Sequence, residues 1–325
     1  MSAKPKSSHE PAPAGLAGFY SQTSDYWTAY LKGRAPLPNS IFQRIFDYHT
    51  CHGGQFHTVH EAGAAAAIHS LRIGAPFTKV IVSDSSEDNI AAARARLSGA
   101  KEAKYELHVT KLEDSGAVLP PASVDMVFCA TMLHFTDLPR SFEAIAHQLK
   151  PGGTFAALFT GFMEMEDARL HAAFIRRLQL WAPLMLEKMG GEEAVMPQFV
   201  TIACMYENVE LPATIFEAQS ERIFINGTDT GAPGGTMYAD TMPPDYRERW
   251  PAVSGIGAEE IVIRVDDAEL YFEKDLSALP YHLNTFPPAK VEGWVEESMR
   301  ELGEIVGDGK IRGRWPVNLI LATRK

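Results

Sequence analysis

Five short apolar segments alternate with segments of helical periodicity between residues 40 and 160. The apolar segments span 58–62, 79–84, 105–109, 124–129 and 154–159, and the helical patterns span 40–48, 66–73, 86–97 and 141–149. Strands that are apolar on both faces are typical of a parallel sheet covered by helices. We therefore predict an α/β fold built on a doubly wound sheet. Ligands of such sheets bind outside the carboxyl ends of the strands.

The flanking regions differ from this core in composition and pattern. Residues 1–18 are rich in Pro, Ala, Ser and Lys, which predicts a disordered tail, and we expect residues 19–325 to form a single domain. Residues 161–258 contain a helical pattern at 168–189 and then Gly- and Pro-rich segments, which we interpret as an inserted lid of short helices and loops. Residues 259–325 carry strand patterns at 260–265, 269–272 and 317–323 and a helical pattern at 291–305, and we expect them to complete the sheet.

The charge balance narrows the range of partners. The 325-residue chain has 30 Lys and Arg against 41 Asp and Glu, a formal net charge of −11. This balance argues against binding to nucleic acid or to an anionic membrane surface. No apolar run approaches the roughly 18 residues that a membrane span requires. The N-terminus also lacks the apolar stretch of a signal peptide, so we expect a cytoplasmic protein with a small-molecule substrate.

Metal binding and disulfide bonding are not expected. None of the three cysteines belongs to a CxxC pair. Four histidines are close in sequence, but two of them are three apart near a strand, where odd offsets face opposite sides. These histidines are His49, His52, His57 and His60.

A turn of small residues follows the first predicted strand. It reads Glu61-Ala62-Gly63-Ala64-Ala65-Ala66-Ala67, and Asp84 ends the next strand 84 − 63 = 21 positions after Gly63. A small-residue turn at a helix start, with an acid about 20 residues later, is typical of a nucleotide-binding site. The turn brings backbone amides close to the ligand, and the acid accepts hydrogen bonds from ribose hydroxyls.

Several motifs together resemble one family, the class I S-adenosylmethionine-dependent methyltransferases. The turn at 61–67, the strand at 80–84, segments 124–127 and 132–135, the turn at 149–155, the N-terminal segment 26–34 and the segment 315–317 all fit its pattern. The likeness is greatest to the fungal small-molecule branch related to trans-aconitate methyltransferases. It covers residues 20–160 well and 260–325 loosely. It implies a Rossmann-like sheet with a helical N-terminal segment, a cofactor-binding core at 40–160 and an inserted lid.

The resemblance also implies which residues form the site. The expected cofactor-binding residues are Glu61, Gly63, Ala65, Asp84, Ser85, Leu112 and Glu113. The expected substrate-binding residues are Tyr20, Tyr26, Trp27, Tyr30 and Met132. His134 follows the fourth strand, where it is the candidate catalytic residue that orients a substrate or acts as a general base.

The chain departs from the family pattern at two positions. Ala65 and Ala67 stand where the family has glycine, and alanine disfavours the left-handed backbone that glycine adopts freely. Two interpretations remain open. Either the turn still binds S-adenosylmethionine, more weakly, or cofactor binding has been lost.

These alternatives lead to different functions. With the cofactor, we expect an O-methyltransferase of a small organic acid or secondary metabolite. Without it, the pocket would serve a cofactor-free cyclisation or rearrangement in secondary metabolism, with acid–base help from His134 or a tyrosine. A non-catalytic binding protein is a third reading, which no sequence feature specifically supports.

Overall fold

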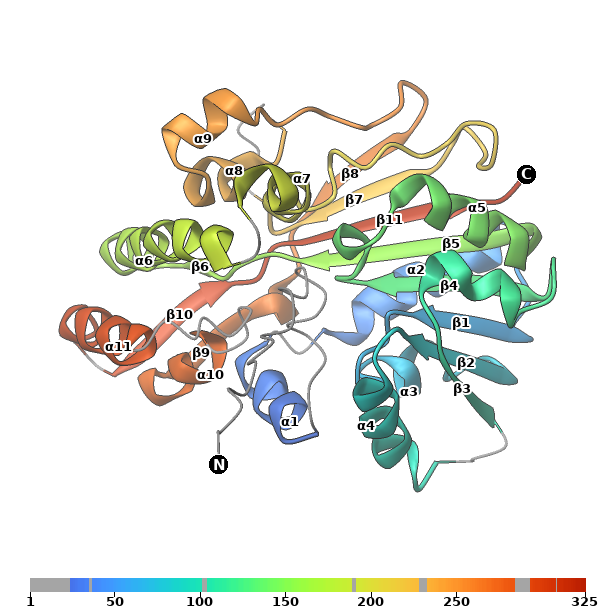
Figure 1. The fold of residues 1–325 in the computed structure, drawn as a ribbon, viewed down its shortest axis with the longest axis horizontal. Helices are drawn as coiled ribbons and strands as arrows, with labels where there is room; N and C mark the ends of the chain where they lie inside the picture. The colour runs from blue at the N-terminus through green and yellow to red at the C-terminus, as the bar shows by residue number, and fades with distance from the viewer. Residues whose placement is uncertain are drawn as a thin grey trace, which may run out of the picture.

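A mostly parallel sheet forms the centre of the molecule (Figure 1). The computed structural model describes residues 24–34, 37–100, 104–188, 191–227, 233–283, 293–307 and 309–325, so the predicted tail at 1–18 and Tyr20 lie outside the described residues. In the described part, the main sheet has the strand order β3-β2-β1-β4-β5-β11-β7-β8. Its strands are β1 (Thr58–Ala62), β2 (Lys79–Asp84), β3 (Tyr105–Val109), β4 (Val124–Ala130), β5 (Leu149–Thr160), β7 (Glu221–Ile225), β8 (Ile261–Val265) and β11 (Val317–Thr323).

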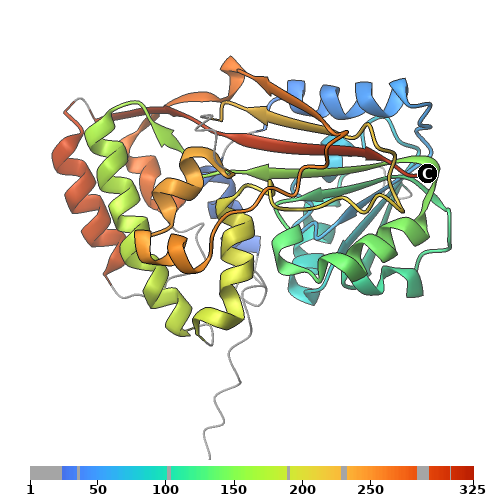
Figure 2. The same ribbon diagram turned by 90° about the horizontal axis from the view of Figure 1, so that it is seen from above.

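Strand direction and helix placement confirm the predicted fold class. Strands β1 to β5 are parallel, whereas β11 runs antiparallel to both β5 and β7. Helix α2 (Asn39–Cys51) lies on one face of the sheet and α5 (Leu138–Gln148) on the opposite face (Figure 2). Helix α4 (Glu87–Leu97) follows β2, and the 3₁₀ helix η3 (Leu112–Ala117) follows β3. This is the doubly wound, Rossmann-like arrangement.

Local chemistry sets the helix starts. The Ser86 side chain caps α4 by accepting a hydrogen bond from Asn89 N at 3.2 Å, and Asp137 caps α5 by accepting one from Arg140 N at 3.1 Å. Because of the second cap, α5 begins three residues before the predicted 141. The pattern at 66–73 yields only α3 (Ser70–Ile73), because Ala65 and Ala67 have φ of 49° and 55°. A helix cannot run through left-handed residues.

Helices and a small sheet form the second part of the molecule, beside the main sheet (Figure 2). Helix α6 contacts α7, α8 and α11, and α10 contacts α1 and α11. The small sheet has the order β6-β10-β9. The helices are α1 (Ser24–Gly33), α6 (Ala168–Lys188), α7 (Glu192–Ala203), α8 (Gly235–Thr241), α9 (Pro244–Arg249), α10 (Leu279–Leu283) and α11 (Trp294–Ile305). The strands are β6 (Glu164–Met165), β9 (Tyr271–Asp275) and β10 (Lys310–Arg314).

The division between lid and sheet differs from the expected one. Strand β7 lies inside the range 161–258 that we interpreted as lid, yet it pairs with β11 and β8 in the main sheet. Conversely, β9 and β10 lie in the range expected to complete the main sheet but belong to the small sheet. Sequence reasoning missed β7 because it carries Arg222, a charged residue that is fully buried.

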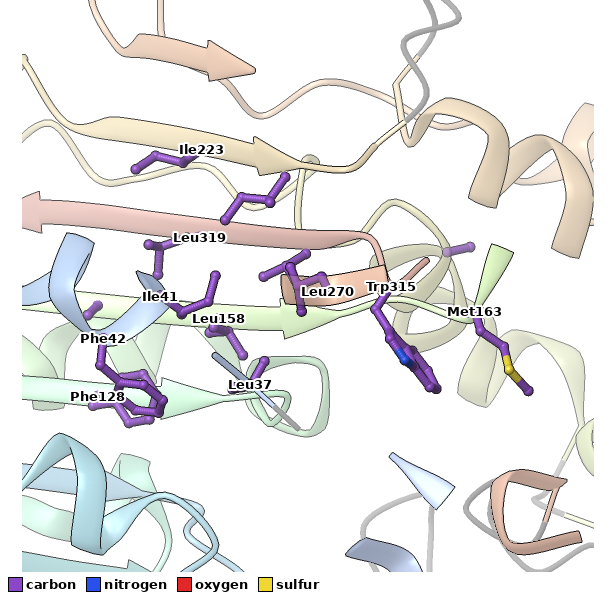
Figure 3. Packing of buried hydrophobic residues seen from close by; sticks show 14 of the residues in the cluster. Leu37, Ile41, Phe42, Phe128, Leu158, Met163, Ile223, Leu270, Trp315 and Leu319 are labelled. Atoms are coloured by element: carbon purple, nitrogen blue, oxygen red, sulfur yellow. The ribbon is translucent and has the colours of Figure 1, made fainter. Parts of the chain in front are cut away.

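One hydrophobic cluster joins the two parts of the molecule. It runs from α2 across the sheet to the turn at Trp315, where the chain passes from β10 to β11. Figure 3 shows part of this cluster, with Leu37, Ile41, Phe42, Phe128, Leu158, Met163, Ile223, Leu270, Trp315 and Leu319 labelled. Because the same core continues under both parts, the helical part is packed onto the sheet rather than tethered to it.

A buried ion pair fixes the sheet to the segment after α7. Arg222 Nε on β7 lies 2.6 Å from Glu260 Oε2. The same guanidinium donates hydrogen bonds to Tyr206 O at 2.9 Å and to Val209 O. These partners satisfy a charge that would otherwise be buried without compensation.

Removal of the Glu260 charge tests this arrangement. We expect Glu260→Gln to lower the free energy of unfolding by roughly 3 kcal/mol, because the buried guanidinium loses its counter-ion. The exposed neighbour Glu259→Gln is the matched control and should change little. Urea denaturation followed by circular dichroism measures both, and equal midpoints for the two variants would contradict the prediction.

Candidate cofactor and substrate site

The carboxyl ends of β1, β2 and β4 meet at one edge of the sheet. Ala62 of β1 pairs with Ser83 of β2 on one side and with Cys129 of β4 on the other. A pocket of about 260 Å³ lies at this edge and is bordered by α1. Eleven of the residues predicted from the sequence line it. They are Trp27, Tyr30, Glu61, Gly63, Ala65, Asp84, Ser85, Leu112, Glu113, Met132 and His134.

The turn after β1 keeps a backbone that suits glycine. Gly63, Ala65 and Ala67 have φ of 63°, 49° and 55°. A Cβ at Gly63 would lie 2.7 Å from Met132 Cε, so this position has no room for a side chain. Ala65 lines the pocket, whereas Ala67 is 1% exposed and packs in the core. Only one of the two alanine methyl groups therefore borders the space where a ligand could lie.

Asp84 connects this turn to β2 and α4. Its Oδ2 accepts a hydrogen bond from Ala65 N at 2.9 Å, and its Oδ1 accepts bonds from Ser86 N at 2.9 Å and Asn89 Nδ2 at 3.0 Å. Asn89 Oδ1 in turn accepts a hydrogen bond from Trp27 Nε1 at 3.0 Å. Asn89 also lines the pocket. No role was assigned to Asn89 from the sequence, so its link between Asp84 and α1 was missed.

Glu61 is a buried carboxyl group at the end of β1. It is 1% exposed and accepts a hydrogen bond from Ser70 Oγ. Burial raises its pKa from 4.5 to about 7, and the Ser70 hydroxyl and the positive charge of Arg96 counteract only part of this shift. The neutral and charged forms of this carboxyl group are therefore both accessible near neutral pH.

His134 meets a tyrosine from the lid. Its Nδ1 lies 3.0 Å from the hydroxyl oxygen of Tyr206, and that oxygen accepts a hydrogen bond from Leu133 N at 2.9 Å. Burial, with the nearby charge of Arg34 as a smaller cause, lowers the pKa of His134 to about 3. The imidazole is therefore neutral at ordinary pH. Tyr206 is far from His134 in sequence and belongs to no motif, so nothing in the sequence pointed to it.

Known proteins of similar sequence are named methyltransferases. A family model described as a methyltransferase domain matches residues 60–157. Methyltransferase AacuQ of Aspergillus aculeatus is 33% identical over 306 residues, which cover 94% of this chain and 95% of that protein. Methyltransferase gedG of Aspergillus terreus is 34% identical over 308 residues, with 94% and 93% covered. The chain belongs to the methyltransferase family.

A solved structure shares the fold of this methyltransferase. It is a candidate type II methyltransferase from Anaeromyxobacter dehalogenans, with a TM-score of 0.57 and 18% identity, and the match covers 89% of this chain and 97% of that one. The resemblance inferred from the sequence is thus confirmed at the level of the methyltransferase family. The closer likeness to trans-aconitate methyltransferases stays a prediction.

Aromatic residues of α1 border the pocket of this methyltransferase. The Trp27 ring packs edge-on against Tyr26 and Tyr30, with ring centroids 5.1 and 5.2 Å apart. Trp27 and Tyr30 line the pocket, whereas Tyr26 is not among the lining residues. Two of the aromatic residues of α1 that were predicted to bind substrate therefore lie at the pocket wall, and their substrate role stays a prediction.

The segments after β2 and β3 also line the pocket. Leu112 is buried, and Ser85, after β2, is exposed. Glu113 Oε1 accepts a hydrogen bond from Asp137 N at 3.0 Å, so its carboxylate also holds the start of α5.

Two of the clustered histidines have hydrogen-bond partners on neighbouring strands or helices. His49 contacts Thr154 Oγ1 at 2.7 Å, and His60 contacts Gln148 Oε1 at 2.5 Å and Ser83 Oγ at 2.8 Å. Among the described residues, no group of three or more His, Cys, Asp or Glu side chains is arranged to hold a metal ion. No helix in the described part of this methyltransferase has the length and apolar character needed to cross a membrane.

The raised pKa of Glu61 predicts a pH-dependent stability. Because the folded-state pKa of about 7 exceeds the reference value of 4.5, the folded protein retains a proton that the unfolded chain has lost. The stabilisation is complete below about pH 4.5 and disappears as pH rises through about 7, a change of roughly 3 kcal/mol. Glu61→Gln should therefore flatten the decline of Tm over this range. Exposed Glu143→Gln is the control, and parallel curves for all three proteins would refute the prediction.

Proposed function

We propose that this protein is an S-adenosylmethionine-dependent O-methyltransferase that acts on a small organic acid or secondary metabolite. The observation that carries the proposal is the turn at 63–67, tied through Ala65 N to Asp84 at the edge where three strands end. Membership of the methyltransferase family supports the choice of methyl donor. The assignment of oxygen as the acceptor atom rests on the position of His134 in the pocket.

The chemistry of the lining residues fits the cofactor. Asp84 Oδ2 accepts one hydrogen bond from the described residues, which leaves a lone pair for a ribose hydroxyl. Gly63 has no room for a side chain and lets the backbone approach a ligand closely. Leu112 offers an apolar surface, and the buried Glu61 offers a carboxyl group to the cationic end of the cofactor. Ser85 and Glu113 border the same space.

The residues of the chain contribute alignment and exclusion of water. When bound, S-adenosylmethionine supplies an electrophilic methyl group that the acceptor oxygen takes in a displacement. Trp27 and Tyr30 of α1 line the pocket, and so do Met132 and Gly63, which lie side by side. Alignment of the reacting groups in such a site can supply much of the rate enhancement.

The role of Asp84 can be tested by cofactor binding. We expect Asp84→Asn to weaken the affinity for S-adenosylmethionine by roughly ten- to a hundredfold, because a charge-assisted hydrogen bond contributes about 1.5–3 kcal/mol. Asp88→Asn, an exposed position on helix α4 four residues after Asp84, is the matched control. Calorimetric titration of both variants, after a check of Tm, gives the comparison. Equal affinities of the two folded variants for the cofactor would show that Asp84 does not bind it.

Substitution of the alanines in the turn tests whether the protein binds the cofactor as a methyltransferase would. We expect Ala65→Gly to tighten cofactor binding severalfold, because it removes a methyl group that borders the pocket. Ala67→Gly relieves the same backbone constraint outside the pocket and should leave the affinity nearly unchanged. The binding constants come from the same calorimetric titration.

Separately, product formation is measured in dialysed protein with and without added cofactor. Full turnover without it would overturn the proposed function in favour of a cofactor-free rearrangement.

A further inference from the structure

The hydroxyl group of Tyr206 has one acceptor for its hydrogen among the described residues. Its oxygen faces the backbone N–H groups of Met132, Leu133 and His134, and it accepts the bond from Leu133 N at 2.9 Å. These groups are donors and cannot accept the phenolic hydrogen. The remaining polar contact is His134 Nδ1 at 3.0 Å. Burial raises the pKa of Tyr206 well above its usual value, so the hydroxyl keeps this hydrogen.

The direction of this bond determines the state of the imidazole. If Tyr206 donates to Nδ1, then Nδ1 carries a lone pair and the ring proton of the neutral imidazole is on Nε2. The opposite tautomer would place two hydrogens between the Tyr206 oxygen and Nδ1, with no acceptor for the phenolic one in the described part of the chain. A buried donor without an acceptor is unfavourable.

The position of Tyr206 is fixed from the sheet. Met205 and Tyr206 have φ of 50° and 66°, a left-handed turn that non-glycine residues rarely adopt. Arg222 Nη1 donates to Tyr206 O at 2.9 Å, and Asn318 Nδ2 donates to Met205 O at 2.6 Å. Two buried side chains from β7 and β11 thus hold both carbonyls of the strained turn. Strain of this kind persists only where the surroundings impose it, and it is frequent at functional sites.

The groups around His134 also disfavour protonation of its imidazole. Phe135 and Phe159 pack against the ring, with centroids 3.9 and 5.9 Å away. Arg34, which lines the same pocket at the end of α1, places a positive charge nearby. A general base becomes an imidazolium when it accepts a proton, and both the apolar rings and the Arg34 charge disfavour that product.

We propose that Tyr206 is a positioning residue that locks His134 in the tautomer with the proton on Nε2, so that His134 acts on the acceptor as a hydrogen-bond donor and not as a general base. This inference rests on the proposed function, because it concerns the acceptor side of the same pocket. Of the two roles considered for His134 from the sequence, it keeps the orientation of a substrate and sets aside the general base. The acceptor oxygen then enters as an anion, and no proton has to leave it during methyl transfer.

Nitrogen NMR of the imidazole rings tests the lock directly, without cofactor or acceptor. The full-length protein is labelled with ¹⁵N-histidine, and the signals of His134 are assigned by their loss in His134→Gln. We expect one neutral tautomer, with the bound proton on Nε2. A proton on Nδ1, or a mixture of tautomers in the wild-type protein, would overturn the proposal. A cofactor that fails to bind would leave this result unchanged, so the two proposals fail separately.

A pair of tyrosine variants tests the part played by the hydroxyl group. Tyr206→Phe removes the donor to Nδ1 while keeping the ring, and we expect the His134 signals to change to those of a tautomer mixture. Tyr238→Phe is the matched control, because it removes another lid hydroxyl, which donates to Trp250 O. It should leave His134 unchanged. An unchanged tautomer in folded Tyr206→Phe would overturn the positioning role. If Tyr206→Phe does not fold, the wild-type spectrum still decides the tautomer.

Discussion

The position of β1 between two parallel neighbours determines where the site forms. Because β2 and β4 flank β1 in register, the residues that follow each strand emerge at the same edge of the sheet. The turn at Gly63, the carboxylate of Asp84 and the segment that carries His134 therefore border one pocket although they are far apart in sequence. Parallel strands allow this, since antiparallel neighbours would send successive ends to opposite edges.

Two chains of hydrogen bonds connect this pocket to the elements around it. Trp27 on α1 reaches Asp84 through Asn89, so the N-terminal helix is attached to the residue proposed to hold the ribose. On the other side, Tyr206 reaches His134, and Arg222 attaches the Tyr206 turn to the main sheet. The Tyr206 turn of the lid is therefore anchored next to the pocket by buried polar contacts, which fix geometry more narrowly than apolar packing alone.

Local sequence patterns predicted the strands and helices of the cofactor-binding core. They did not predict the contacts between residues that are far apart in the sequence. Each strand and helix between residues 40 and 160 can be recognised from the hydrophobic periodicity within its own segment. Asp84 also follows the turn at the spacing that is typical of a nucleotide-binding site. By contrast, β7 is recognisable as a buried strand only once Glu260, 38 positions away, is seen to pair with Arg222. Asn89 bonds to Trp27, 62 positions away, and Tyr206 contacts His134, 72 positions away. No local sequence pattern encodes those pairings.

The alanine-containing turn shows why a weakened motif can still specify its geometry. A left-handed alanine is disfavoured by roughly 1–2 kcal/mol, which a folded domain can absorb if other contacts fix the path. Here the path is fixed by main-chain amides: Ala64 N donates to Ser83 O, Ala65 N to Asp84, and Ala67 N to Ala64 O. Such bonds do not depend on the side chain that each residue carries. Gly63 has a similar φ to the two alanines and differs from them in its surroundings, because a Cβ at Gly63 would lie 2.7 Å from Met132 Cε. The one glycine retained in the turn is thus the one that sterics require.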